Sequence, residues 1–196
     1  MLTQPDHALL RKAQRGDAEA FSEIVRAYEL PVFNYVLRLV GDRALAEDLT
    51  QEVFLRVFQG LPRFSFQSKF TTWLFQVTKN RVHDEFRARE CRPRCVELSE
   101  VRSPLVAATP IERSETIDSL WRAVEGLNLD LKTSLLLRDV VGLSYNEIAD
   151  SLGITLASVK WRIYQARQEV QLTLAGEGIT SASADETTFA GSSASA

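Results

Sequence analysis

The stretch from Ser144 to Val170 contains side chains whose types and spacing are suited to reading DNA. A helix-turn-helix needs a small residue where its two helices cross, a glycine that can adopt a positive φ in the turn, and a branched apolar residue that anchors the second helix. Ala149, Gly153 and Val159 supply these residues, with Gly153 four positions and Val159 ten positions after Ala149. Thr155 can cap the second helix. The remaining core positions hold Ile148, Leu152, Ile154 and Ile163.

The second helix of this motif presents hydrogen-bond donors and flat rings on the side that faces away from its core. Such side chains suit phosphate oxygens and the base edges of the major groove. The alternative is a helical hairpin with an ordinary solvated face, but many positions agree with the DNA-binding pattern at once. The predicted DNA-facing residues are Ser158, Lys160, Trp161, Arg162, Tyr164, Gln165 and Arg167.

A second candidate site combines aromatic rings with positive charge. Between Arg63 and Cys95 the chain has eight basic and three acidic residues, although its overall formal net charge is -3. Rings stack on unpaired bases and cations hold the backbone, so this composition suits opened DNA. Aromatic residues at helical spacing are also typical of a buried core, and the residues alone leave both interpretations open. The candidates are Phe64, Phe66, Phe70, Trp73 and Phe75, followed by Asn80, Asp84 and Arg87 at spacings of four and three.

A third candidate is a polar, mostly acidic stripe opposite the buried face of a predicted helix. Most stripes of this kind are solvated surface, although a partner that offers arginines could pair with it. The stripe consists of Glu47, Asp48, Gln51 and Glu52.

Apolar residues recur at helical spacing almost everywhere, and the chain lacks the alternation typical of a strand, so we expect an all-α fold. Asp6, Asp17 and Asp42 can each cap a helix. Pro31 should kink the second helix or restart it. The third should end near Gly60, and a fourth should run from about residue 69 to 89. The buried stripe predicted for the third helix is Leu45, Leu49, Val53, Val57 and Phe58.

The chain divides into two helical units. Residues 90–113 contain three of the six prolines and show no lasting periodicity, which indicates a flexible linker. Sixteen of the last 21 residues are Ser, Ala, Gly or Thr, which predicts a disordered tail. We therefore expect domains at 1–90 and 114–175, a linker at 91–113 and a tail at 176–196. Helical periodicity in the second unit resumes with Ile117, Leu120, Trp121, Val124 and Leu127, and continues in the run 131–141.

Composition excludes several classes of function. With 196 residues, 45% hydrophobic and 25% charged, the chain is typical of a globular protein. No stretch approaches the roughly eighteen apolar residues of a membrane span, and the start lacks the apolar segment of a secretion signal, so we expect a cytoplasmic protein. Cys91, Cys95 and His83 lack a fourth ligand at zinc spacing, so we expect neither a metal nor a redox role. No residue pair has the partners that catalysis requires, so we expect neither an enzyme nor a cofactor.

Two blocks of the sequence resemble a known family. The run AEDLTQEVFLRVFQGLPRFSFQSKFTTWLFQVTKNRVHDEFRAR, followed after a proline-bearing linker by GLSYNEIADSLGITLASVKWRIYQAR, is similar to the two conserved regions of bacterial extracytoplasmic-function sigma factors. Members of this family are compact two-domain proteins that bring RNA polymerase to promoters. The resemblance covers about residues 21–170, in the family's order and spacing.

The resemblance implies roles for each candidate site. Segments like AEDLTQEVF bind the clamp coiled coil of the largest polymerase subunit, which assigns core-polymerase binding to Asp48, Gln51 and Glu52. Segments like FSFQSKFTTWL and VTKNRVHDEFR capture and open the minus-ten promoter element, which assigns that task to Phe64, Trp73, Asn80, Asp84 and Arg87. The helix-turn-helix would read the minus-thirty-five element. Bases would be approached by Lys160, Trp161, Tyr164 and Gln165, and phosphates would be held by Arg162 and Arg167.

The chain also departs from the family pattern. The second domain commonly opens with a Leu-Pro pair and an arginine, where this chain has Leu127, Asn128, Leu129 and Lys132. Trp161 stands where a small residue is common, so the minus-thirty-five sequence cannot be borrowed from relatives. The resemblance implies an anti-sigma factor as a further partner. The tail that ends at Ala196 could serve as a handle for an ATP-driven protease, or it could be inert.

Two other functions compete with the sigma-factor interpretation. A stand-alone helix-turn-helix regulator would bind duplex promoter tightly without polymerase. A helical adaptor that sequesters another protein would not depend on DNA, and charge reversal at Lys160 and Arg162 would leave its activity intact. The stand-alone regulator leaves the aromatic basic segment and the acidic stripe unexplained.

Overall fold

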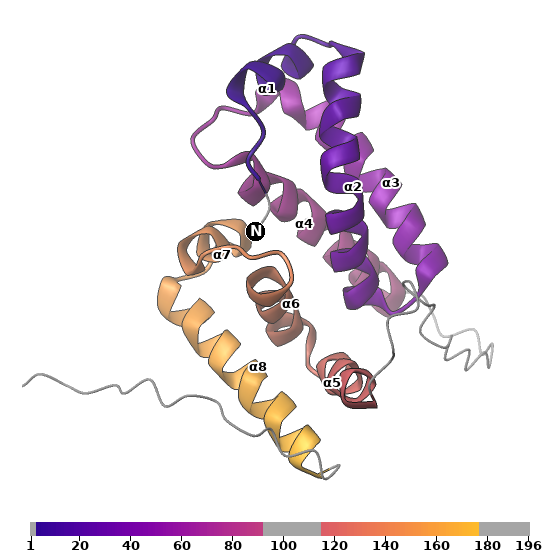
Figure 1. The fold of residues 1–196 in the computed structure, drawn as a ribbon, viewed down its shortest axis with the longest axis vertical. Coiled ribbons are helices and arrows are strands. Elements are labelled where there is room, and N and C mark those ends of the chain that lie inside the picture. Colours follow the sequence, from indigo (N-terminus) through magenta and orange to yellow (C-terminus); the bar gives the residue numbers. More distant parts are fainter. Residues whose placement is uncertain (1–2, 92–114, 177–196) are drawn as a thin grey trace, which may run out of the picture.

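The computed structural model describes residues 3–91 and 115–176. Within these two ranges the chain forms α-helices and one 3-10 turn but no strand, which confirms the all-α prediction (Figure 1). The expected linker, apart from its first residue, and the expected tail beyond residue 176 lie outside the described residues. The elements are α1 (His7–Gln14), α2 (Ala18–Val40), α3 (Arg43–Gly60), η1 (Leu61–Arg63), α4 (Phe70–Cys91), α5 (Glu115–Glu125), α6 (Leu129–Asp139), α7 (Tyr145–Leu152) and α8 (Leu156–Gly176).

Aspartates cap the first three helices as the sequence predicts. The carboxylates of Asp6, Asp17 and Asp42 accept hydrogen bonds from backbone N–H groups in the first turns of α1, α2 and α3. Pro31 does not divide α2, which continues as one helix to Val40 and ends at Gly41 with a left-handed φ of 72°. Of the two alternatives predicted at Pro31, a kink or a restart, the restart is therefore wrong.

Helices α1 to α4 enclose the N-terminal part of the apolar core. Its largest fully buried side chains include Tyr28 and Tyr35 from α2 and Phe70 and Phe75 from α4. The stripe expected for α3 is confirmed at Leu49, Val53 and Val57, but Leu45 is only half-buried and Phe58 is 49% exposed. Phe58 directly follows Val57, and one residue turns a helix by about 100°, which carries its ring out of the core.

The second unit contains the predicted helix-turn-helix, formed by α7 and α8. Ser144 and Glu147 form a reciprocal capping box at the start of α7, and Gly153 ends that helix with a φ of 67°. Ile148, Val159 and Ile163 are buried, and the backbone N–H of Ser158 donates to Thr155 Oγ1 at 3.1 Å. The core pattern and the Thr155 cap are thus confirmed. Two positions expected in the apolar pattern of α5, Ile117 and Leu120, are instead exposed.

We expect Gly153→Ala to destabilise the second unit by about 1–2 kcal/mol, the cost of a left-handed conformation for a residue with a Cβ. The added methyl would meet nothing within 4 Å, so the cost arises from the backbone alone. Gly126→Ala is the matched control, since Gly126 does not have a positive φ and its Cβ would make only ordinary contacts. Thermal unfolding followed by circular dichroism measures both. Equal melting of the two variants would contradict the role assigned to Gly153.

Helix α6 belongs to the second unit and faces the first, and its middle is buried on every side. Residues 131–137 are all buried, because one face of α6 packs on α8 and another packs on α2 (Figure 1). This buried run includes the polar residues Lys132, Thr133 and Ser134. Burial lowers the pKa of Lys132. The contact between the units is therefore partly polar.

Specific side-chain contacts join the two units. Lys69 Nζ, just before α4, pairs with Glu147 Oε1 of α7 at 2.9 Å, and Thr133 Oγ1 lies 3.4 Å from Nε2 of His83 in α4. The Arg38 guanidinium of α2 lies 3.5 Å from the ring centroid of Trp121 in α5. The helix-turn-helix and the aromatic basic segment are thus neighbours, an arrangement that the sequence pattern does not predict.

Candidate nucleic-acid interface

Helix α8 presents three of its predicted DNA-facing side chains to solvent. Lys160 is exposed, and Trp161 and Tyr164 are 60% and 63% exposed. The two rings are three residues apart and so lie on the same face of the helix. An exposed tryptophan, tyrosine and lysine together give a surface that can contact both bases and phosphates.

The other predicted residues of α8 already have partners within the protein. Arg162 pairs with Asp130 at 2.9 Å and Arg167 pairs with Asp139 at 2.8 Å, so both arginines reach back to α6. Gln165 Nε2 donates to Glu169 at 3.0 Å, and the Ser158 hydroxyl lies 2.8 Å from that of Thr155. Each of these side chains therefore already makes one internal contact, although a guanidinium has further N–H donors that remain for phosphate.

The aromatic segment between α3 and α4 forms a ring cluster. Phe64 is only 8% exposed, and its ring centroid lies 5.0 Å from that of Phe66, 5.1 Å from Trp73 and 6.0 Å from Phe70. Trp73 is half-buried against Gly60, whose missing side chain leaves room for the indole. The sequence left two interpretations of these aromatics, contact with unpaired bases or burial in the core. Phe64, Phe70 and Phe75 are buried in the core. Phe64 has little exposed surface in this arrangement, and its role at the minus-ten element stays a prediction.

The polar candidates of α4 are more accessible than the rings. Asn80 is exposed, and the Arg87 side chain is 74% exposed and lies 3.8 Å from Asp84. Asp84 Oδ2 also accepts a hydrogen bond from Arg56 of α3 at 3.2 Å. Lys79 is partly buried between the units; its pKa is lowered first by burial and then by Arg87, while Asp130 acts in the opposite direction. Arg162 of α8 also lowers the pKa of Lys79, so these two cationic groups lie within electrostatic reach of each other.

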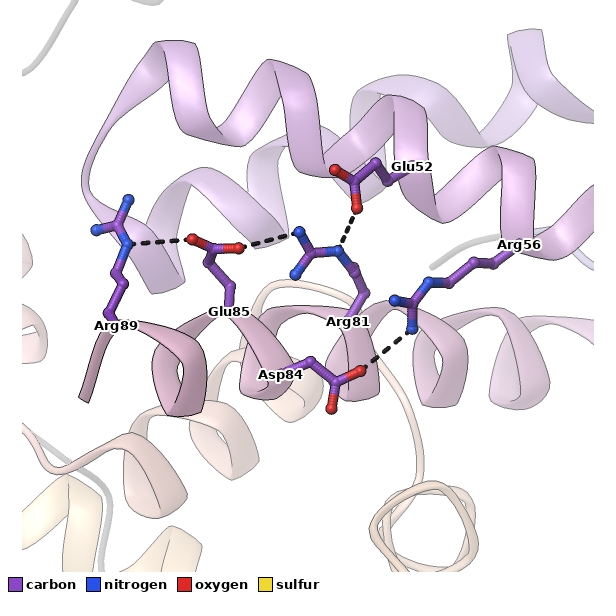
Figure 2. Close-up of polar contacts among 6 residues, drawn as sticks. All are labelled: Glu52, Arg56, Arg81, Asp84, Glu85 and Arg89. Carbon is purple, nitrogen blue, oxygen red and sulfur yellow. Dashed lines mark hydrogen bonds and ion pairs between the residues drawn. The ribbon is translucent and has the colours of Figure 1, made fainter. Parts of the chain in front are cut away.

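A chain of ion pairs fixes α4 against α3 (Figure 2). Arg81 is largely buried and hydrogen-bonds to Glu52 of α3 and, at 3.0 Å, to Glu85 of its own helix. Glu85 in turn accepts from Arg89 at 3.3 Å. The hydrogen bond from Arg81 lowers the pKa of both Glu52 and Glu85. One predicted core-polymerase contact, Glu52, thus also supports the position of α4.

This network predicts a loss of stability in acid. A carboxyl whose pKa is lower in the folded than in the unfolded chain stabilises the fold above its unfolded pKa, and that stabilisation disappears as the pH falls. We expect the melting temperature to fall more steeply between about pH 5 and pH 3 in the wild type than in Glu85→Gln, with the two curves converging at low pH. Glu29→Gln, at an exposed position of α2, is the control, and its melting temperature should depend on pH as that of the wild type does. Parallel curves for wild type and Glu85→Gln would contradict the prediction.

The acidic stripe of α3 is exposed and has an apolar border. Asp48 and Gln51 face solvent, and Leu55, 61% exposed, lies one turn further along the same face. Phe58 continues this face and meets Phe21 edge-on with ring centroids 5.0 Å apart. We call Asp48, Gln51, Glu52, Leu55 and Phe58 the α3 face. The apolar part of this face was not predicted from the sequence, although Leu55 is out of phase with the buried Val53 and Val57.

The described residues also bear on the expectations about metal binding and membrane spans. Across residues 3–91 and 115–176, no three His, Cys, Asp or Glu side chains gather in a way that could hold a metal ion. Cys95 lies outside these ranges, so the expectation that the cysteines have neither a metal nor a redox role stays a prediction. None of the helices that the structure describes is long and apolar enough to span a membrane.

Comparison with known proteins identifies the family. Residues 24–91 match the family Sigma-70 region 2, and residues 117–170 match Sigma-70, region 4. The RNA polymerase sigma-H factor of Pseudomonas aeruginosa is 31% identical over 189 residues, which cover 89% of this chain and 96% of that protein. The ECF RNA polymerase sigma-E factor of Escherichia coli strain K12 is 29% identical over 84% of this chain and 92% of its own length. The chain is an extracytoplasmic-function sigma factor. It directs transcription initiation, as the resemblance implies.

Solved structures show the same fold as this sigma factor. CnrH, solved with the cytosolic domain of CnrY, superposes with a TM-score of 0.68 at 20% identity and covers 88% of this chain and 98% of its own. The sigma factor RpoE of Bartonella quintana, solved with the anti-sigma factor NepR, gives a TM-score of 0.69 at 22% identity, with coverages of 81% and 98%.

Proposed function

We propose that this sigma factor binds core RNA polymerase through the α3 face, captures and opens the minus-ten element with α4 and the segment before it, and reads the minus-thirty-five element with α8. One observation supports the proposal above all. The chain matches both region 2 and region 4, and each matched region has exposed residues among its predicted contacts. Asp48 and Gln51 supply polar contacts to polymerase, and Leu55 supplies an apolar one.

The proposed division of labour on DNA follows from exposure. Lys160, Trp161 and Tyr164 face outward and contact the duplex directly, whereas Arg162 and Arg167 hold phosphates through their further N–H donors. On α4, Asn80 and Arg87 are accessible to the minus-ten strand. Flipping a base costs a few kcal/mol, which a preformed pocket with rings and cations can offset.

Transcription reconstituted from purified parts tests the proposal. Core RNA polymerase from the bacterium that encodes the chain is mixed with fragmented genomic DNA, with and without the sigma factor, and the RNA 5′ ends are sequenced. We expect new start sites that share two upstream elements. An absence of new starts would overturn the proposal.

An electrophoretic shift on such a promoter separates the proposal from its main competitor. The mildly acidic chain should bind duplex DNA weakly alone and tightly with core polymerase. Tight binding that polymerase does not improve would favour a stand-alone helix-turn-helix regulator.

Two further partners belong to the proposal. An anti-sigma factor is supported by analogy with the Bartonella quintana RpoE complex. An ATP-dependent protease that takes hold of residues 176–196 is motivated by their composition, and equal half-lives of the full chain and a chain that ends at Ala175 would remove it. Because it acts with polymerase, we place the protein in the cytoplasm, without a resident cofactor or an enzymatic activity of its own.

A further inference from the structure

The N-terminal segment 4–14 lies along the segment that connects α3 to α4 (Figure 1). His7, Arg11 and Gln14 are spaced by four and three residues and so share one face of α1. Each of them contacts residues 61–66, and Gln4, before the helix, contacts Thr71. The match to the Sigma-70 region 2 family begins only at residue 24, so it does not include this segment.

Gln14 and Gln4 hold the two ends of the connecting segment. Gln14 Nε2 donates to the carbonyl oxygens of Leu61 at 3.0 Å and Phe64 at 2.8 Å, which uses both of its N–H groups. Gln4 Oε1 accepts from the backbone N of Thr71 at 3.4 Å and from its Oγ1 at 3.1 Å. That N–H belongs to the first turn of α4 and has no acceptor within the helix.

Phe66, in the middle of the segment, has a strained backbone. Its φ is 60°, and it is the one non-glycine residue with a positive φ in the part of the chain that the structure describes. A bulky residue keeps such a conformation only where its surroundings impose it. The surroundings are His7, stacked at 5.2 Å with an interplanar angle of 21°, the Arg11 guanidinium 5.2 Å above the ring, and Phe64.

We propose that residues 4–14 position the segment 61–71 for promoter opening, with His7 and Arg11 acting through Phe66 and Gln14 acting through the backbone. This inference rests on the proposed function, which assigns capture of the minus-ten element to the same segment. Gln4, His7, Arg11 and Gln14 are positioning residues and need not touch DNA. Strain held at one residue by a separate helix is typical of functional sites.

The structural part of the proposal is tested without DNA. Arg63 and Lys69 are exposed trypsin sites within the segment. We expect Gln14→Ala and Arg11→Ala to speed cleavage at these two sites by several-fold at a temperature at which both variants remain folded. Arg15→Ala is the matched control, because Arg15 is an exposed arginine directly after α1 without a side-chain partner in the described part of the chain. Unchanged cleavage in both variants would overturn the proposal.

The functional part compares two templates of one promoter, a full duplex and a duplex with a pre-opened minus-ten region. We expect Gln14→Ala to lower transcription from the duplex by about tenfold and from the pre-opened template by less than threefold, since each lost hydrogen bond contributes modestly. A merely structural defect would lower both equally, which would overturn the inference. If the wild type starts RNA from neither template, the proposed function itself fails.

A double-mutant comparison tests the route through Phe66. If His7 acts through this ring, His7→Ala should change duplex transcription severalfold in the wild-type background and hardly at all in the Phe66→Ala background. Equal effects in both backgrounds would overturn that route.

Discussion

Leu55→Arg is expected to weaken binding to core RNA polymerase by about 30-fold or more, the factor that corresponds to about 2 kcal/mol at a central interface residue. Leu55 is 61% exposed and lies beside Gln51 and Glu52, in the centre of the α3 face. The substitution removes an apolar contact and places a positive charge where arginines of the partner are expected. The change should not unfold the protein, because arginine forms helices well and the position is on the surface.

Leu30→Arg provides a matched control for this prediction. Leu30 is a leucine of similar exposure, 64%, on α2, so the same change of charge and volume occurs away from the α3 face. Fluorescence anisotropy with labelled sigma factor and purified core polymerase gives both dissociation constants. If the two variants bind equally well, the assignment of the α3 face to polymerase fails.

Lys160→Glu should produce the second large effect, a drop of about 10- to 100-fold in transcription from promoters that depend on the minus-thirty-five element. Lys160 is exposed beside Trp161 on α8. Unlike Arg162, Lys160 has no ion-pair partner among the described residues, so reversing its charge breaks no ion pair within the protein. The readout also shows what Lys160 touches, since loss of a phosphate contact reduces the salt dependence of binding, whereas loss of a base contact relaxes sequence preference at one position.

Arg26→Glu is the control for Lys160→Glu. Arg26 is exposed on α2 and undergoes the same change of two charge units. It should leave transcription within about twofold of wild type. Equal losses in the two variants would mean that net charge, and not a contact of α8, determines promoter use.

Local structure could be predicted from the sequence because its causes are local. The aspartate caps, the capping residues of α7 and α8 and the turn at Gly153 depend on side chains within a few residues of one another. The core of the helix-turn-helix follows in the same way from the spacing of Ala149, Gly153 and Val159.

Contacts between distant segments could not be predicted. Periodicity identifies which face of a helix is apolar but not what covers it, so the pairing of Arg162 with Asp130 and the packing of α6 on α2 give no sequence signal. Phe66 is a further example, because its positive φ depends on a helix some fifty residues earlier in the chain. The burial of Phe64 and the exposure of Leu55 are settled by the same tertiary packing.

The buried polar groups at the contact of α6 with the first unit affect the equilibrium between joined and separated units. The Tyr35 hydroxyl is buried beside Thr133 without a hydrogen bond of good geometry, and Lys132 is buried as well. Water would satisfy these groups on separation, which lowers the free energy needed to part the units. On the proposed function, the two promoter elements lie more than two turns of duplex apart, about 70–80 Å, so units in mutual contact cannot engage both. The apparent affinity for a promoter would then be proportional to the fraction of molecules in which the units have separated. Substitutions at Thr133 would change that fraction, and with it the level of transcription, although Thr133 itself would not contact DNA.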